Sequence, residues 1–73
     1  MSLAEIFILT KSLEALQELI KEEEMRDRHL VEYYKEKEQD YSEPQNRIEQ
    51  YMLQRNTISE VIDIIDGLKV KVR

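Results

Sequence analysis

His29 is the only histidine of the chain and the first residue to weigh for metal or acid–base chemistry. Di-metal carboxylate bundles use Glu-x-x-His on two helices, so a glutamate should stand three residues before the histidine. That position holds Arg26, a cation where a ligand is required, while Glu32 follows His29 at the same spacing. Without a second histidine or any cysteine, we expect no metal site and a partly exposed helical histidine.

The many carboxylates are the other candidates, because paired Asp and Glu can act as general acid and base. Such catalysis needs a concave, desolvated pocket, which a pair of packed helices does not naturally form. A single glycine excludes phosphate loops, dinucleotide fingerprints and nucleophile elbows, and the absence of cysteine excludes thiolate catalysis. We therefore expect no catalytic residue, no cofactor and no enzymatic activity.

Composition points to an all-α chain of one domain, residues 1–73. Strong helix formers dominate, and one Gly with one Pro leave too little turn chemistry for a many-stranded fold. The net charge of −5 argues against binding to nucleic acid or to anionic membranes. No apolar run approaches the roughly 18 residues of a membrane span, so a cytoplasmic location is expected.

Pro44 marks the one clear break in the helical pattern, since proline is tolerated only in the first turn of a helix. Ser42 and Gln45 have the spacing of a capping box, in which each residue binds the other's backbone N–H. The chain should therefore form an antiparallel helical hairpin. Its expected parts are helix one over about 3–40, a turn over about 41–43, helix two over about 43–66 and a tail over 67–73.

Local signals also mark the two ends of the hairpin. Ser2 and Glu5 repeat the capping-box spacing where helix one begins, and Gly67 supplies a stop for helix two. After Gly67, apolar and basic residues alternate. That alternation fits either a frayed last turn or a short strand paired with residues 6–9.

Apolar residues recur at steps of three and four, the heptad rhythm of packed helices and coiled coils. On helix one Glu23 and Asp27 interrupt this stripe, and on helix two Arg55 occupies a seam position, where we expect it to pair with one of them. The stripe of helix one is Ile6, Leu9, Leu13, Leu16, Ile20, Leu30, Tyr34 and Tyr41. That of helix two is Ile48, Tyr51, Arg55, Ile58, Ile62 and Ile65, widened by Val61, Ile64 and Leu68.

Folding the chain about residues 42–43 places Ile20 opposite Ile65 and Ile58 opposite the acidic Asp27. Each buried Leu or Ile contributes about 1.5–3 kcal/mol, so a hairpin whose apolar blocks miss each other needs a partner. We expect either a homodimer that forms a four-helix bundle or docking onto another helical protein. The expected interface residues are Leu9, Leu13, Leu16, Ile20, Ile58, Val61, Ile62, Ile65 and Leu68.

Charge is concentrated on helix one. Residues 1–43 carry 6 basic and 12 acidic groups, whereas residues 44–73 carry 5 basic and 4 acidic groups. The acidic faces should point outward, either as a solvated surface, as a docking surface for a basic partner or as a mimic of nucleic-acid charge. The acidic run at 22–24 also allows a different fold, in which helix one breaks and three helices shield one another.

Four tyrosines gather near the expected turn. Tyr34 and Tyr51 should pack across the hairpin, a pairing that contributes about 0.5–1.5 kcal/mol beyond burial. The cluster serves either the core or the binding of a partner. Its members are Tyr33, Tyr34, Tyr41 and Tyr51.

In outline the chain resembles the small helical-hairpin chaperones of bacterial type III secretion. The likeness rests on length, acidity, the Pro44-Gln45 start of helix two and an isoleucine-rich ending at Ile62, Ile64 and Ile65. It implies a co-chaperone or accessory subunit that docks on a larger complex. The residues themselves favour a self-associating, non-enzymatic interaction module that binds neither nucleic acid nor membrane.

Overall fold

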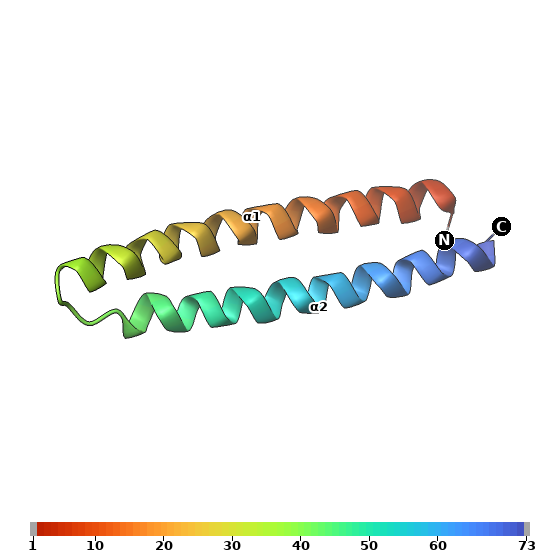
Figure 1. Cartoon of the computed structure of the whole chain (residues 1–73). Coiled ribbons are helices and arrows are strands. Elements are labelled where there is room, and N and C mark those ends of the chain that lie inside the picture. The colour runs from red at the N-terminus through yellow and green to blue at the C-terminus, as the bar shows by residue number, and fades with distance from the viewer. Residues whose placement is uncertain (1, 73) are drawn as a thin grey trace.

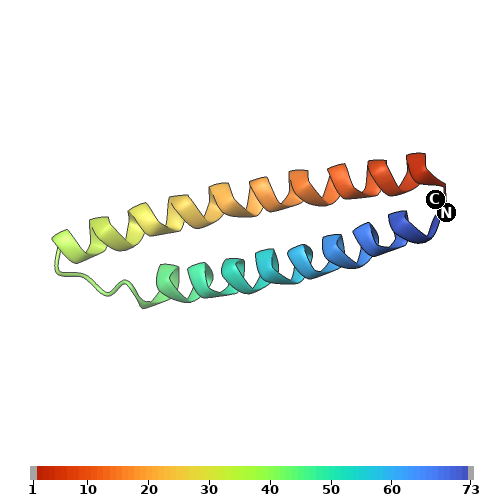
Figure 2. The same ribbon diagram turned by 45° about the vertical axis from the view of Figure 1, so that its right-hand side comes forward.

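Two long helices make up almost all of residues 2–72, the part of the chain that the computed structural model describes. Helix α1 spans Leu3–Glu36 and helix α2 spans Ser42–Val72. They run antiparallel, with both termini at one end and the connection at the other (Figure 1; Figure 2). The hairpin measures 57 × 15 × 11 Å. The all-α hairpin predicted from the sequence is confirmed, and residues 2–72 contain no strand.

Helix α1 begins with the predicted capping box. The Glu5 N–H donates to Ser2 Oγ at 3.1 Å, and the Ser2 N–H donates to Glu5 Oε1 at 3.4 Å. The helix then continues unbroken through residues 22–24, so the three-helix alternative is wrong. Ion pairs one turn apart, including Arg28 with Glu24 at 3.0 Å, keep this charged stretch helical.

Helix α1 ends at Glu36, about one turn earlier than the expected Asp40. Glu38 adopts the left-handed conformation, with φ of 56°. Its N–H donates to Lys35 O, and the Gln39 N–H donates to Tyr34 O at 2.8 Å. These two bonds form a Schellman motif, which normally uses glycine at the left-handed position. A glutamate there gives no signal in the sequence, so the prediction of the helix end was wrong.

Helix α2 begins at Ser42, and its start uses a different cap from the one predicted. Asp40 Oδ1 accepts the Ser42 N–H at 2.9 Å, so Asp40 takes the capping role assigned to Ser42. This backbone bond, together with a bond from the Ser42 hydroxyl, lowers the pKa of Asp40. Gln45 donates its N–H to Tyr41 O rather than completing a capping box.

Helix α2 passes through Gly67 and continues to Val72, so the predicted stop and the strand-like tail are wrong. Gly67 has no positive φ, which the left-handed cap would require. The helix continues because its last turns lie beside the first turns of α1, where Ile6 and Ile65 are buried. Arg73, the end of the predicted tail, lies outside the described residues.

The two helices meet in a register about two turns away from the expected one. Ile20 and Ile58 line the same groove, whereas Ile20 was expected beside Ile65. Asp27 binds Arg47 instead of facing Ile58. The early end of α1 and the longer connection cause this shift. The predicted clash between the apolar block of α2 and the acidic part of α1 is therefore wrong.

Apart from Pro44, only four apolar side chains of the described residues are buried. On α2 the predicted stripe is confirmed, since Ile48 and Ile65 are buried and the residues between them on the stripe are half-buried. On α1 the seam is turned by one residue, so that Thr10 and Gln17 replace the predicted Leu9 and Leu16. The α1 seam consists of Ile6, Thr10, Leu13, Gln17, Ile20, Glu24, Asp27, Val31 and Tyr34.

Candidate protein-interaction surface

Polar side chains hold the middle of the hairpin together. Gln17 Nε2 donates to Ser59 Oγ at 2.8 Å and to the backbone oxygen of Arg55 at 3.3 Å. Arg47 binds Asp27 with two parallel bonds of 3.0 Å, from Nε and from Nη2. The bond to Asp27 also raises the pKa of Arg47. Charged pairs with this forked geometry are among the stronger hydrogen bonds in proteins.

Glu24 lies at the centre of this polar seam, with a side chain only 7% exposed. Its Oε2 accepts from Arg28 Nε at 3.0 Å within α1, and its Oε1 lies 2.7 Å from Arg55 Nη2 across the helices. Among the buried side-chain nitrogen and oxygen atoms of residues 2–72, Glu24 Oε1 and Arg55 Nε lack a well-aligned hydrogen-bond partner. The contact across the helices is thus an ion pair rather than a directed hydrogen bond. The sequence predicted Asp27 or Glu23 as the partner of Arg55, and both predictions were wrong. Asp27 lies about one helical turn from the observed partner Glu24, and Glu23 lies one residue from it.

A row of leucines is left exposed because α1 turns these polar residues toward α2. Leu9 and Leu16 are 37% and 44% exposed, although they directly precede the seam residues Thr10 and Gln17. Helical spacing places further exposed apolar residues of both helices on the same side. We call this side the groove face: Leu9, Leu16 and Leu19 of α1 with Leu53, Val61, Ile64 and Leu68 of α2.

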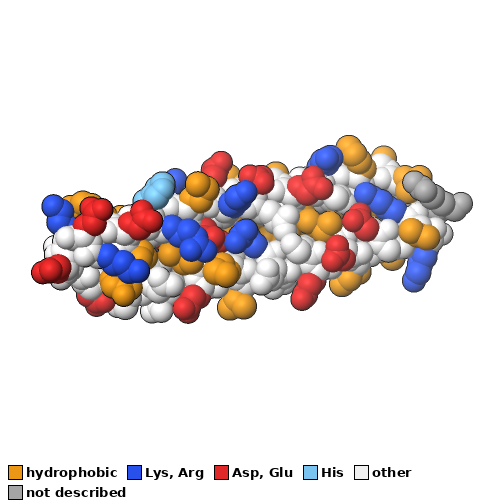
Figure 3. Space-filling view, in the orientation of Figure 1, with side chains coloured by type: hydrophobic (Ala, Val, Ile, Leu, Met, Phe, Trp, Pro, Cys, Tyr) orange, Lys and Arg blue, Asp and Glu red, His pale blue; other side chains and the backbone are white. Residues whose placement is uncertain are grey.

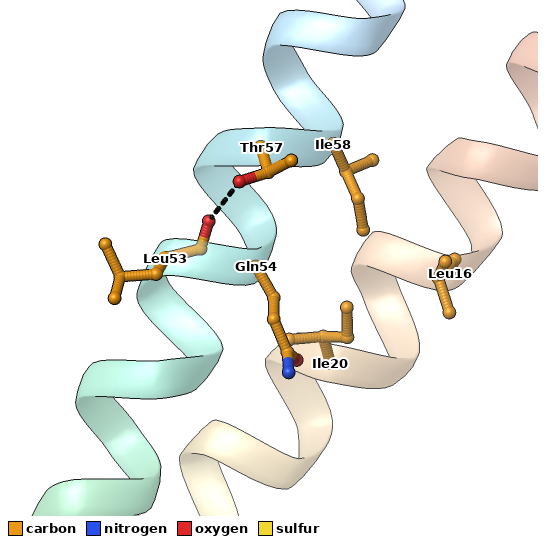
Figure 4. A pocket seen from close by; sticks show the side chains of 6 residues that line it. All are labelled: Leu16, Ile20, Leu53, Gln54, Thr57 and Ile58. Carbon is orange, nitrogen blue, oxygen red and sulfur yellow. Dashed lines mark hydrogen bonds between the residues drawn. The ribbon is translucent and has the colours of Figure 1, made fainter.

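An open groove of about 510 Å³ lies at the middle of the groove face. Figure 4 shows Ile20 and Ile58 between the helices and Leu53 pointing outward from α2. The Thr57 hydroxyl donates to Leu53 O at 3.0 Å, so it is satisfied within its own helix. The lining contains no charged side chain: Leu16, Ile20, Leu53, Gln54, Thr57 and Ile58. Such a surface suits an apolar occupant better than a polar ligand.

Charged side chains of both signs are spread along the side of the molecule shown in Figure 3. A smaller hollow near the connection is edged by Arg28, Glu32 and Lys35 over Val31 and Ile48. In a chain with 37% charged residues, an uncharged groove with exposed leucines and isoleucines around it is unusual. This contrast makes the groove face the candidate interaction surface.

The nine predicted interface residues divide into two groups. Five of them face the other helix of the same chain: Leu13, Ile20, Ile58, Ile62 and Ile65. Four remain exposed on the groove face: Leu9, Leu16, Val61 and Leu68. Leu19, Leu53 and Ile64 belong to this face but were not among the nine, because they lie off the heptad stripes from which the interface was predicted.

The aromatic residues near the connection pack differently from the expectation. Tyr34 forms an edge-to-face pair with its neighbour Tyr33, with ring centroids 5.7 Å apart. In the observed register Tyr34 lies beyond the reach of Tyr51, so the predicted pair across the hairpin does not form within residues 2–72. Lys35 lies over the Tyr41 ring at 4.9 Å. His29 is exposed on α1.

No protein-family model, curated protein or solved structure matches the chain. The likeness to secretion chaperones stays a prediction. None of the helices within residues 2–72 is long and apolar enough to cross a membrane. The groove face must therefore be interpreted from its own geometry.

Proposed function

We propose that the protein is a non-enzymatic interaction module whose groove face binds a second copy of the chain. Two hairpins packed face to face make a four-helix bundle, a common way to complete a small helical core. The observation that carries the proposal is the orientation of α1. It places Thr10, Gln17 and Glu24 against α2 and leaves Leu9 and Leu16 in solvent.

The size of the hairpin also suits a homodimer. A standard interface buries about 800 Å² on each partner, roughly one seventh of the 5717 Å² surface of the hairpin. A domain of this size with so few buried apolar side chains usually gains stability from oligomerisation. A second copy offers the same uncharged groove and leucines, so apolar surface covers apolar surface without burying an unpaired charge.

A cytoplasmic location is part of the proposal. The chain has no cysteine, so the hairpin depends on no disulfide and suits a reducing compartment. The acidic charge on the outer faces of the bundle favours solubility and discourages nonspecific binding to nucleic acid.

Analytical ultracentrifugation over a dilution series, with circular dichroism at each concentration, tests the proposal. The wild-type chain should be a helical dimer that dissociates on dilution, with a Tm that rises with concentration. The double variant Leu9→Glu and Leu16→Glu should lose the dimer, because it places two charges in the apolar interface.

A matched control comes from Phe7 and Met25, which are 56% and 50% exposed. Each lies nine residues from Leu16, or two and a half helical turns, and so points to the opposite side of α1. The variant Phe7→Glu with Met25→Glu should remain dimeric. A wild-type chain that is a stable monomer at all concentrations would overturn self-association, as would equal dissociation of the two double variants.

A further inference from the structure

The groove face changes character along its length. Toward the open end of the hairpin, where the termini lie, its positions hold Leu9, Leu16 and Leu19 on α1. The same heptad positions one repeat further toward the connection hold Glu23 and Arg26, which form an ion pair at 3.0 Å. One repeat further still, these positions hold Leu30 and Tyr33, so the apolar row of α1 is continuous only in the open half of the hairpin.

Helix α2 shows the same division. Val61, Ile64 and Leu68 occupy the face near the open end. The equivalent heptad positions near the connection hold Glu43 and Arg47, an ion pair at 3.1 Å. Apart from Leu53, which lies six residues from Ser59 toward the connection, the groove face of both helices thus presents its apolar side chains in the open half and charge pairs in the closed half.

The apolar residues of the two helices lie at matching levels. Gln17 and Ser59 are level with each other because they are hydrogen-bonded. Leu16 and Val61 lie one and two residues away from them toward the open end. Leu9 and Leu68 lie eight and nine residues away, which is about 12–14 Å at 1.5 Å per residue. Leucine on α1 is therefore level with an apolar residue on α2 in each layer.

On the basis of the self-association proposed above, we infer that two copies pair with their open ends together, so that α1 of one copy lies beside α2 of the other. The twofold axis then runs along the bundle. Leu16 of one copy meets Val61 of its partner, and Leu9 meets Leu68. The charge pairs of both closed halves lie together at the other end, where they stay near solvent.

The opposite orientation fails on packing. A half-turn about the middle of α1 exchanges Leu16 with Glu23, because these residues are equally far from the two ends of Leu3–Glu36. It therefore sets the apolar half of one copy against the charged half of the other. Burying a charged group against leucine is costly unless the charge remains fully paired.

The opposite orientation also fails on electrostatics. It places α1 beside α1 of the partner, and residues 1–43 carry 12 acidic against 6 basic groups. With the open ends together, each acidic α1 instead neighbours an α2, whose segment from 44 to 73 carries 5 basic and 4 acidic groups. Like charges on adjacent helices repel, so both criteria select the same arrangement.

Pulsed electron–electron double resonance, which measures the distance between two spin labels, distinguishes the two orientations. The chain has no cysteine, so one introduced cysteine carries the only nitroxide, and every measured distance is between copies. Gln39→Cys places the label in the exposed connection, and Lys21→Cys places it on an exposed site near the middle of α1. Both sites lie outside the groove face.

With the open ends together, the Gln39 labels should lie within about 40 Å of each other, because four-helix bundles have interhelical spacings of about 8–10 Å. A Gln39 distance close to the 57 Å length of the hairpin, with a short Lys21 distance, would overturn the orientation but leave the dimer intact. Absence of coupling between Lys21 labels at concentrations up to the solubility limit would overturn self-association itself.

Discussion

Arg55 of α2 approaches Glu24 of α1 to 2.7 Å, in the middle of a seam where two helices of this kind usually present apolar side chains. The carboxylate has little access to water, while the arginine side chain is one-third exposed. Arg28 supplies a second cation from the same helix as Glu24. The pair matches one residue of α1 to one residue of α2. A shift of the helices by a turn would separate the buried Glu24 from Arg55 and leave it with Arg28 alone, so the pair favours the observed register.

Removing Glu24 should destabilise the hairpin more than its replacement by an apolar pair. Glu24→Ala leaves Arg55 without its partner and should lower the free energy of unfolding by about 2–3 kcal/mol. The double variant Glu24→Leu with Arg55→Leu should restore or exceed the wild-type stability, because leucines fill the same seam without a desolvation cost. Urea denaturation at one fixed chain concentration measures both. A double variant less stable than the wild type would show that the ion pair adds net stability.

Glu38 is the residue whose replacement should most simply stabilise the connection. A left-handed backbone costs an L-residue roughly 1–2 kcal/mol. Glycine avoids this cost, but it loses more conformational entropy on folding, which offsets part of the gain in stability. Glu38→Gly should therefore raise the free energy of unfolding by about 0.5–1 kcal/mol, measured by thermal denaturation. Glu38→Ala is the control, since it removes the charge near the helix C-terminus but keeps the Cβ. Equal stabilisation by both variants would assign the effect to charge rather than to backbone strain.

The signals for helix ends explain why the fold was predictable and the register was not. Helix formers and a single proline were enough to predict two helices. The stop at Glu38 depends on two backbone bonds and a strained glutamate, which no residue type signals. At Gly67 the residue type signalled a stop, yet tertiary contact of α2 with α1 keeps the helix going. An error of about one turn at the connection then moved every cross-helix contact.

The candidate surface was only partly predictable for a related reason. The heptad pattern placed Leu9 and Leu16 on the helix-one stripe, and they were also predicted to contact a partner, but the pattern did not indicate that Thr10 and Gln17 would take their place against α2. Their polar neighbours took that place because α2 offers matching groups, Ser59 for Gln17 and Arg55 for Glu24. Hydrophobicity alone cannot predict which of two adjacent stripes of α1 faces α2 when α2 is itself polar at the positions in contact.

The Asp40 cap should make stability depend on acid pH. Hydrogen bonds from Ser42 lower the pKa of Asp40 from 3.8, so the folded state favours the carboxylate. The stabilisation is complete above pH 3.8 and is lost as the pH falls through the lower folded-state pKa. Asp40→Ala should be less stable than wild type near neutral pH, and the difference in Tm should shrink in acid. Asp63→Ala, an exposed mid-helix substitution, is the control for loss of one carboxylate. A difference that is constant with pH would contradict the capping role.

The hairpin should tolerate a side chain at Gly67 and become more stable with one. A Cβ built on this residue meets no atom within 4 Å, and its backbone is helical. Alanine loses less conformational freedom than glycine in a helix, so Gly67→Ala should raise the free energy of unfolding by up to about 1 kcal/mol. Thermal denaturation followed by circular dichroism measures the change. If the helix instead ended at Gly67, as its residue type suggested, alanine would destabilise the chain.

The neighbouring isoleucines Ile64 and Ile65 separate folding from association. Ile65 is 6% exposed and packs within the hairpin, whereas Ile64 is 67% exposed on the groove face. Ile65→Ala creates a cavity that should lower the free energy of unfolding by about 2–4 kcal/mol. The Tm should therefore fall by at least about 10 °C at every concentration. Ile64→Ala should instead reduce the rise of Tm with concentration, because it removes contact area only in the dimer. Melting curves over a hundredfold range of concentration measure both effects. If Ile64→Ala leaves the concentration dependence unchanged, Ile64 lies outside the interface.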